Sequence, residues 1–141
     1  MEQDCIFCKI ANGHIPSATV YEDEMFRVIL DLSPATKGHA LVLPKRHFRN
    51  IFDIDETTAS RLFVVAAKVA RAMKKSLGCE GLNIVQNNEE IAGQTVFHFH
   101  LHIIPRYADD GQKILWNPGT SDPEVQKEIA CKISEALDAD K

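Results

Sequence analysis

Residues 97–103 alternate between large apolar side chains and histidines, and this pattern constrains the fold more than any other segment of the 141-residue chain. Side chains on a β-strand point alternately to its two faces, so we predict that residues 95–104 form a strand. His98, His100 and His102 would then share one face. The other face would carry four large apolar residues, Phe97, Phe99, Leu101 and Ile103. Such a strand would pack into a hydrophobic core on one side and present reactive or metal-binding groups on the other.

The rest of the pattern predicts an α+β domain. Apolar and β-branched residues between short polar breaks indicate further strands at residues 19–22, 25–31, 38–43 and 82–86. Apolar residues at helical spacing predict a long central helix over 56–77: Leu62, Val65, Ala66, Val69 and Met73. We expect a short helix over 5–11 and a C-terminal helix that begins near Asp122-Pro123. The loops between neighbouring strands are too short for crossovers, which favours a five-stranded antiparallel sheet.

Length and charge narrow the class of protein. The chain has no internal repeat or low-complexity linker, so we expect a single domain over residues 1–141. The net charge is −4 and the charges are interleaved, which argues against a broad nucleic-acid-binding surface. The amino terminus is polar, and no apolar run approaches the roughly 18 residues that cross a bilayer. We therefore expect a cytoplasmic protein without a nucleic-acid or membrane partner.

Two groups of residues suggest chemistry and leave alternatives open. The three histidines can be ordinary polar residues, three ligands of one metal, or a metal ligand beside a nucleophile. Small and amide residues in the preceding segment 87–95 suit a phosphate pocket and favour the third alternative. Cys5 and Cys8 form a CxxC pair, which is compatible with a metal site, a redox pair or two unpaired thiols. His39 either supports the histidines from a neighbouring strand or only fills a position in that strand.

The histidine segment also carries a family resemblance. The run His98–Ile104 follows Ala92-Gly93-Gln94-Thr95-Val96 and precedes Pro105-Arg106. Together with residues 5–10, 30–34 and 38–47, this pattern resembles the histidine triad (HIT) family, in its Hint-like branch of nucleotide hydrolases. The similarity covers about residues 5–107, which leaves 108–141 as a tail and C-terminal helix. The resemblance implies a HIT-like fold.

The resemblance also implies a reaction. His100 is the expected nucleophile, which attacks an α-phosphate and forms a nucleotidyl-histidine that water then hydrolyses. His102 and Gln94 are expected to assist by contacting the phosphate or the leaving group. Purine nucleoside phosphoramidates, such as adenosine 5′-phosphoramidate or a lysine adduct of AMP, are the preferred substrates. The alternatives are a dinucleoside polyphosphate hydrolase, a nucleotide-binding scaffold or sensor with incidental turnover, and a zinc-dependent interaction module.

The same resemblance assigns binding residues. The positions expected to bind the AMP or GMP moiety are Ile6, Phe7, Ile10, Ile29, Asp31, Leu32, Asn87, Gly93, Gln94, Thr95, His100 and His102. Asp31 would accept hydrogen bonds from the ribose hydroxyls. Four residues match a zinc site of some family members, and their ligand types suit a closed structural site: Cys5, Cys8, His47 and His98. The resemblance implies a homodimer and no organic cofactor.

Overall fold

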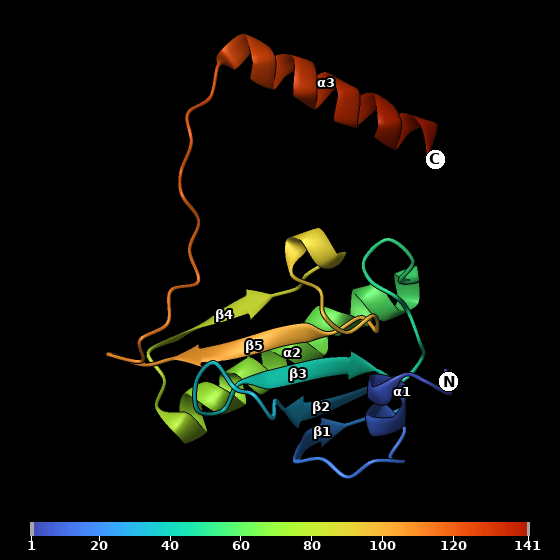
Figure 1. Cartoon of the computed structure of the whole chain (residues 1–141), viewed down its shortest axis with the longest axis vertical. Helices are drawn as coiled ribbons and strands as arrows, with labels where there is room; N and C mark the ends of the chain where they lie inside the picture. Colours follow the sequence, from blue (N-terminus) through green and yellow to red (C-terminus); the bar gives the residue numbers. More distant parts are fainter. Residues whose placement is uncertain (1, 141) are drawn as a thin grey trace.

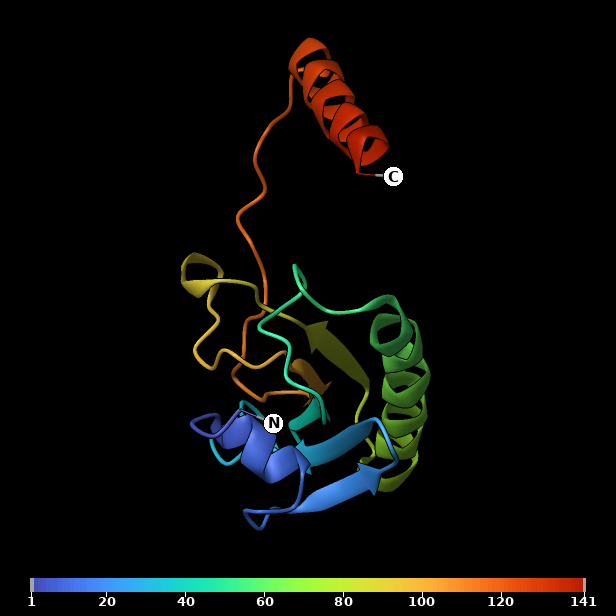
Figure 2. The ribbon, with the colours of Figure 1, turned by 90° about the vertical axis from the view of Figure 1, so that its right-hand side faces the viewer.

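The computed structural model describes residues 2–140 and confirms the predicted α+β fold. Its elements are α1 (Ile6–Ala11), β1 (Thr19–Glu22), β2 (Phe26–Leu30), β3 (Ala40–Pro44), α2 (Glu56–Leu77), β4 (Gly81–Val85), the short 3-10 helix η1 (Glu90–Ala92), β5 (Leu101–Arg106) and α3 (Pro123–Ala139). The five strands form one antiparallel sheet in the order β1-β2-β3-β5-β4 (Figure 1). The helix α2 covers one face of this sheet, and α1 lies on the other (Figure 2).

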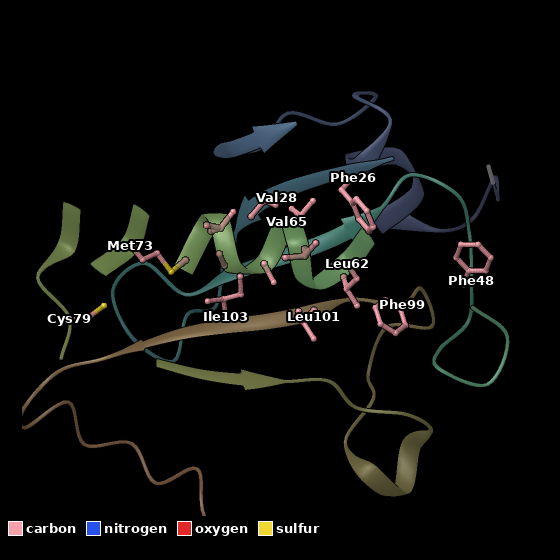
Figure 3. Close-up of a cluster of buried hydrophobic side chains, with 14 residues drawn as sticks. Phe26, Val28, Phe48, Leu62, Val65, Met73, Cys79, Phe99, Leu101 and Ile103 are labelled. Carbon is pink, nitrogen blue, oxygen red and sulfur yellow. The ribbon is translucent and has the colours of Figure 1, made fainter. Parts of the chain in front are cut away.

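Local signals define where the long helix α2 begins and ends. The Asp55 carboxylate accepts a hydrogen bond from the Thr58 backbone N–H at 2.8 Å and caps the first turn. Gly78 ends the helix in the left-handed conformation, with φ at 66°, which glycine adopts without steric cost. The helix is amphipathic, and its apolar stripe faces the sheet (Figure 3).

The main core lies between α2 and the sheet. Its buried members come from both layers: Phe26, Val28, Ala40, Val42, Phe48, Leu62, Val65, Ala66, Val69, Met73, Cys79, Phe99, Leu101 and Ile103 (Figure 3). A smaller buried cluster holds α1 against the opposite face and consists of Ile10, Ala11, Ile29, Leu41 and Leu43. All residues of β3 are buried, because its alternate side chains enter these two clusters. The central strand therefore fixes both faces of the sheet, and the face under α1 is the one that carries the histidines.

The predicted strand 95–104 is wrong at its start, because β5 begins only at Leu101. The partner strand β3 pairs Val42 with Leu101, and two residues further along it ends at Pro44. Proline has no N–H to donate to a ladder, and the Pro44 carbonyl is instead bound by the His98 ring at 2.8 Å. His98 and His100 consequently precede the strand, and Phe97 is partly exposed outside the core.

The C-terminal part of the chain stands away from the rest. Residues 113–122 run without regular structure to α3, whose residues are all exposed (Figures 1 and 2). Asp122 caps α3 by accepting from the Glu124 backbone N–H at 2.9 Å, and Pro123 occupies the first turn, as the sequence predicts. Across residues 2–140, every helix is too short or too polar to span a bilayer.

Candidate active site

A cavity of about 410 Å³ opens between α1 and the sheet, beside the histidines. Nine of the twelve residues expected to bind a nucleotide line it: Ile6, Phe7, Ile10, Ile29, Asp31, Leu32, Thr95, His100 and His102. Apolar side chains from α1 and β2 form its walls, while the carboxylate and the imidazoles lie together on the sheet side. The cavity thus has an apolar compartment of the kind that accepts a planar base, next to polar groups that can address a sugar and a phosphate.

His100 presents an unprotonated ring nitrogen to this cavity. Its Nδ1 lies 2.7 Å from the His98 carbonyl oxygen, which can only accept a hydrogen bond, so Nδ1 carries the proton. The other nitrogen, Nε2, then has a free lone pair. Burial lowers the pKa of His100 below that of an ordinary imidazole, which keeps the ring neutral at pH 7. The Phe7 ring packs edge-on against it, with 5.0 Å between the ring centroids.

His102 has the opposite arrangement of protons. The Ala35 backbone N–H donates to His39 Nδ1 at 2.9 Å, so the proton of the His39 ring is on Nε2. That Nε2–H donates to His102 Nδ1, also at 2.9 Å, and the proton of a neutral His102 must therefore be on Nε2. Burial, followed by the neighbouring His100 and His39, lowers the pKa of His102 to about 4. His102 is thus a neutral hydrogen-bond donor beside the free lone pair of His100.

Asp31 is positioned next to this pair by the end of β2. Its backbone N–H donates to the His39 carbonyl at 2.9 Å, and its Oδ1 accepts from the Ser33 N–H at 2.9 Å. Its Oδ2 lies 3.6 Å from His39 Nε2. The carboxylate partly opposes the effect of burial on the pKa of His39, which is nevertheless lowered. Asp31 therefore lies within reach of a ligand in the cavity.

The Gln94 side chain is hydrogen-bonded to neighbouring loops of the protein and does not line the cavity. The side chain is 2% exposed, and its Oε1 accepts from Asn50 Nδ2 at 3.1 Å and from the Glu89 N–H at 2.8 Å. Its Nε2 donates to the carbonyls of Arg49 at 2.7 Å and Val96 at 3.1 Å. Both polar atoms of the amide are thus occupied, and a phosphate contact by this side chain would require it to rearrange.

Asn87 and Gly93 also lie outside the cavity lining. They are neighbours, since a Cβ at Gly93 would lie 3.4 Å from Asn87 Nδ2. Gly93 has φ at 97°, a conformation that favours glycine and closes the turn after η1. Thr95 and Val96, which follow Gly93 and Gln94 directly, do line the cavity.

The four predicted zinc ligands come together at the other end of the histidine segment. The ligand atoms of Cys5, Cys8, His47 and His98 all lie within 4.8 Å of one another. Cys8 Sγ is 3.3 Å from His47 Nδ1 and 3.4 Å from His98 Nδ1. His98 Nε2 donates to the Pro44 carbonyl, so its Nδ1 lone pair is directed at the two sulfurs. Two thiols and two imidazoles in this arrangement fit a closed tetrahedral zinc site.

The model of the HIT domain family matches residues 12–109. The chain belongs to the HIT domain family. A crystallised protein from Streptococcus mutans UA159 is 47% identical and superposes with a TM-score of 0.93 over 97% of this chain and 87% of its own. Adenosine 5′-monophosphoramidase hnt1 of Schizosaccharomyces pombe is 36% identical over 94% of this chain and 98% of its own. A zinc-bound histidine triad family protein from Mycobacterium smegmatis is 37% identical over 98% of both chains, with a TM-score of 0.74.

Some residues of this HIT domain site were missed by the sequence reasoning. Ile15, Pro16 and Ala18 line the cavity from the loop between α1 and β1, where residues follow no periodic pattern. Arg49 and Asn50 hold the segment before the histidines by binding Glu89 and Gln94. The signal that could have indicated the second group is chemical, because an acidic residue and amides in a loop of this kind require partners when they are buried.

Proposed function

We propose that this HIT protein hydrolyses purine nucleoside phosphoramidates through a nucleotidyl-His100 intermediate. The observation that carries the proposal is the complementary protonation of two ring nitrogens. His100 Nε2 has a free lone pair, the neighbouring His102 Nε2 bears a hydrogen, and both residues line one cavity. The cavity lining supports placement of a purine among Ile6, Phe7 and Ile29, with the ribose hydroxyls at Asp31.

The reaction would run in two displacements. His100 Nε2 attacks the α-phosphorus, the P–N bond breaks, and the leaving nitrogen departs as the amine with a proton drawn from the surrounding water. The ring now carries phosphorus on Nε2 and hydrogen on Nδ1, so it is positively charged. The His98 carbonyl at 2.7 Å stabilises this charge. His102 donates to a phosphoryl oxygen or to the leaving group, and water then cleaves the P–Nε2 bond and releases the nucleoside monophosphate.

We further propose that Cys5, Cys8, His47 and His98 hold a structural zinc ion that fixes the amino-terminal segment to the sheet. The ligand set, the distances among the four residues and the zinc-bound relative from Mycobacterium smegmatis support this assignment. The ion would balance the charge of its four ligands and fix their geometry, and it would not take part in the reaction. A homodimer in the cytoplasm, as expected from the sequence, completes the proposal.

The decisive experiment compares the wild-type protein with His100→Ala on adenosine 5′-phosphoramidate, with release of AMP as the readout. We expect the variant to lose at least about a thousandfold in turnover, and acid quenching of the wild type to trap nucleotide on a peptide containing His100. His14, an exposed histidine of the loop after α1, offers the matched control His14→Ala, which should turn over normally.

Other outcomes separate the alternatives. Equal activity of His100→Ala and the wild type would remove His100 as the nucleophile. If the wild type cleaves dinucleoside polyphosphates at least a hundredfold faster than the phosphoramidate, the leaving-group assignment is wrong although the nucleophile stands. Tight AMP binding without turnover of either substrate class identifies a sensor or scaffold.

A further inference from the structure

Glu89, in the loop before the histidines, has a backbone conformation that only glycine adopts without strain. Its φ is 74° and its ψ is 157°, in a region where the Cβ of any other residue crowds the backbone. Among residues 2–140, Asp109 is the one other non-glycine residue with a positive φ, and aspartate is among the residues enriched in the left-handed region. A residue keeps a strained conformation only when its contacts hold it there, and such residues are concentrated at functional sites.

The side chain of Glu89 supplies these contacts. Arg49 donates from Nη2 to one carboxylate oxygen at 2.7 Å and from Nε to the other at 3.2 Å, and Asn50 Nδ2 donates to the second oxygen at 2.8 Å. These hydrogen bonds lower the pKa of Glu89 to about 2, so the carboxylate is ionised at pH 7. The Arg49 guanidinium is itself held over the Phe97 ring, 4.3 Å from its centroid. Because Glu89 and Arg49 are about half exposed, water screens their attraction, and the main effect of the contacts is to fix the direction of the Glu89 side chain.

The backbone of Glu89 holds the next part of the loop. Its N–H donates to Gln94 Oε1 at 2.8 Å, and its carbonyl accepts from the Gln94 N–H at 3.1 Å. The Gln94 side chain in turn donates to the Val96 carbonyl at 3.1 Å. Thr95 and Val96 are the residues of this loop that line the cavity beside His100. A residue 89 with an ordinary negative φ would redirect at least one of the two backbone groups that bind Gln94.

We propose that Glu89 is a positioning residue, whose contacts with Arg49 and Asn50 hold a strained backbone that sets Thr95 and Val96 at the edge of the cavity. The inference rests on the proposed function, because that function places the phosphoryl group beside these residues. A glycine at position 89 would adopt the same backbone without strain, but it would have no side chain to bind the loop of Arg49 and Asn50. The glutamate therefore exchanges backbone strain for a fixed orientation of the segment that leads to His100.

Two substitutions of the same residue separate this role from a general effect on folding. Glu89→Ala keeps the Cβ, and thus the strain, but removes the carboxylate. We expect its kcat on adenosine 5′-phosphoramidate to fall about 10- to 100-fold, because a small displacement beside the reacting phosphate is costly, with KM within about threefold of wild type. Glu89→Gly removes the strain as well, so it should recover at least about fivefold of the lost kcat while remaining below wild type.

Glu22 provides the matched control. It is also about half exposed and also bound by two cations, Arg27 at 2.8 Å and Lys45 at 2.7 Å, but it lies in β1 and away from the cavity lining. Glu22→Ala should therefore leave kcat within about twofold of wild type. Thermal unfolding of all three variants establishes that they are folded, and if Glu89→Ala is not, the comparison of Glu89→Gly with wild type decides.

Backbone amide signals in ¹H–¹⁵N spectra give a readout that does not depend on turnover. We expect the signals of Thr95 and Val96 to shift in Glu89→Ala and to return toward the wild-type positions in Glu89→Gly, while those of Ile10 and Ile29 stay in place. An inactive wild type would remove the proposed function, and these signals would still decide whether Glu89 sets the segment. Unmoved signals at 95 and 96, a Glu89→Ala kcat within about threefold of wild type, or equal losses in the alanine and glycine variants would each overturn the proposal. Equal losses would mean that the charge of the carboxylate acts, and not the backbone that it holds.

Discussion

His39 does not line the cavity, yet the structure makes it the residue that determines the proton position on His102. The Ala35 N–H fixes the tautomer of His39, and His39 in turn fixes that of His102, through two contacts of 2.9 Å. Replacing His39 with leucine removes the second contact. His102 can then carry its proton on either nitrogen, and its Nε2–H is no longer fixed.

The expected loss of kcat follows from the interaction that the substitution removes. Removing a complete transition-state donor costs about 100- to 1,000-fold in kcat, whereas removing a group that orients a functional histidine costs about 10- to 100-fold. His39→Leu leaves His102 in place, so we expect kcat on adenosine 5′-phosphoramidate to fall about 10- to 100-fold, or about 1.4–2.7 kcal/mol of activation free energy. The KM should change little, because the cavity walls are untouched.

His39→Gln provides the matched control, since a glutamine amide can both accept from Ala35 and donate to His102. We expect it to recover at least tenfold of the lost kcat. Nitrogen-15 chemical shifts of the imidazoles report the tautomer of His102 directly, and they should show Nε2–H in the wild type and in His39→Gln but a mixture in His39→Leu. A His39→Leu enzyme with kcat within threefold of wild type, or with an unchanged His102 tautomer, refutes the reasoning.

Three further predictions concern pH, metal and the buried amide. Burial lowers the pKa of His100 below its ordinary value, so the acid limb of kcat/KM should be centred below pH 6.5, and an acid limb centred at 6.5 or above contradicts this. Cys8→Ser should abolish stoichiometric zinc and lower the melting temperature, whereas the exposed Cys131→Ser should do neither; zinc analysis and calorimetry decide. Gln94→Leu should cost about 3 kcal/mol of unfolding free energy in urea, because it leaves buried backbone and Asn50 groups unsatisfied. An unchanged urea midpoint combined with lost activity would instead favour direct phosphate contact by Gln94.

Local patterns predicted the elements of the fold well where each element depends on its own residues. The helix α2 matches its predicted span because the apolar spacing lies within the segment, and the Asp55 cap and Gly78 lie directly at its two ends. The strand through the histidines was placed too early because a strand also needs a partner. Alternation continues through His98, but β3 ends at Pro44, and that limit is set more than fifty residues earlier in the chain.

The candidate site shows the same contrast between features determined by local residues and features determined by distant ones. Residue types indicated which segments form the candidate site. The resemblance grouped the CxxC cysteines with His47 and His98 as expected zinc ligands, and the structure brings the ligand atoms of these four residues within 4.8 Å of one another. The orientation of Gln94 was beyond the sequence, because it is determined by Arg49 and Asn50 from a distant loop. The sequence predicted a C-terminal helix beginning near Asp122-Pro123, whereas the exposure of all residues of α3 in the described chain appeared only in the structure.

The three histidines differ in role because the backbone and a fourth histidine assign a different proton pattern to each. The Pro44 carbonyl takes the Nε2–H of His98, which directs its Nδ1 at the cysteines. The backbone carbonyl of His98 takes the Nδ1–H of His100 and thereby leaves a free lone pair on His100 Nε2. His98 therefore connects the cluster of Cys5, Cys8 and His47 to His100, the first through its ring and the second through its carbonyl. A displacement of its backbone would change the proton position on His100, so an ion that immobilises His98 can support catalysis without touching the substrate. If the proposed zinc and the proposed nucleophile are correct, this connection gives the physical reason for placing the metal site beside His100.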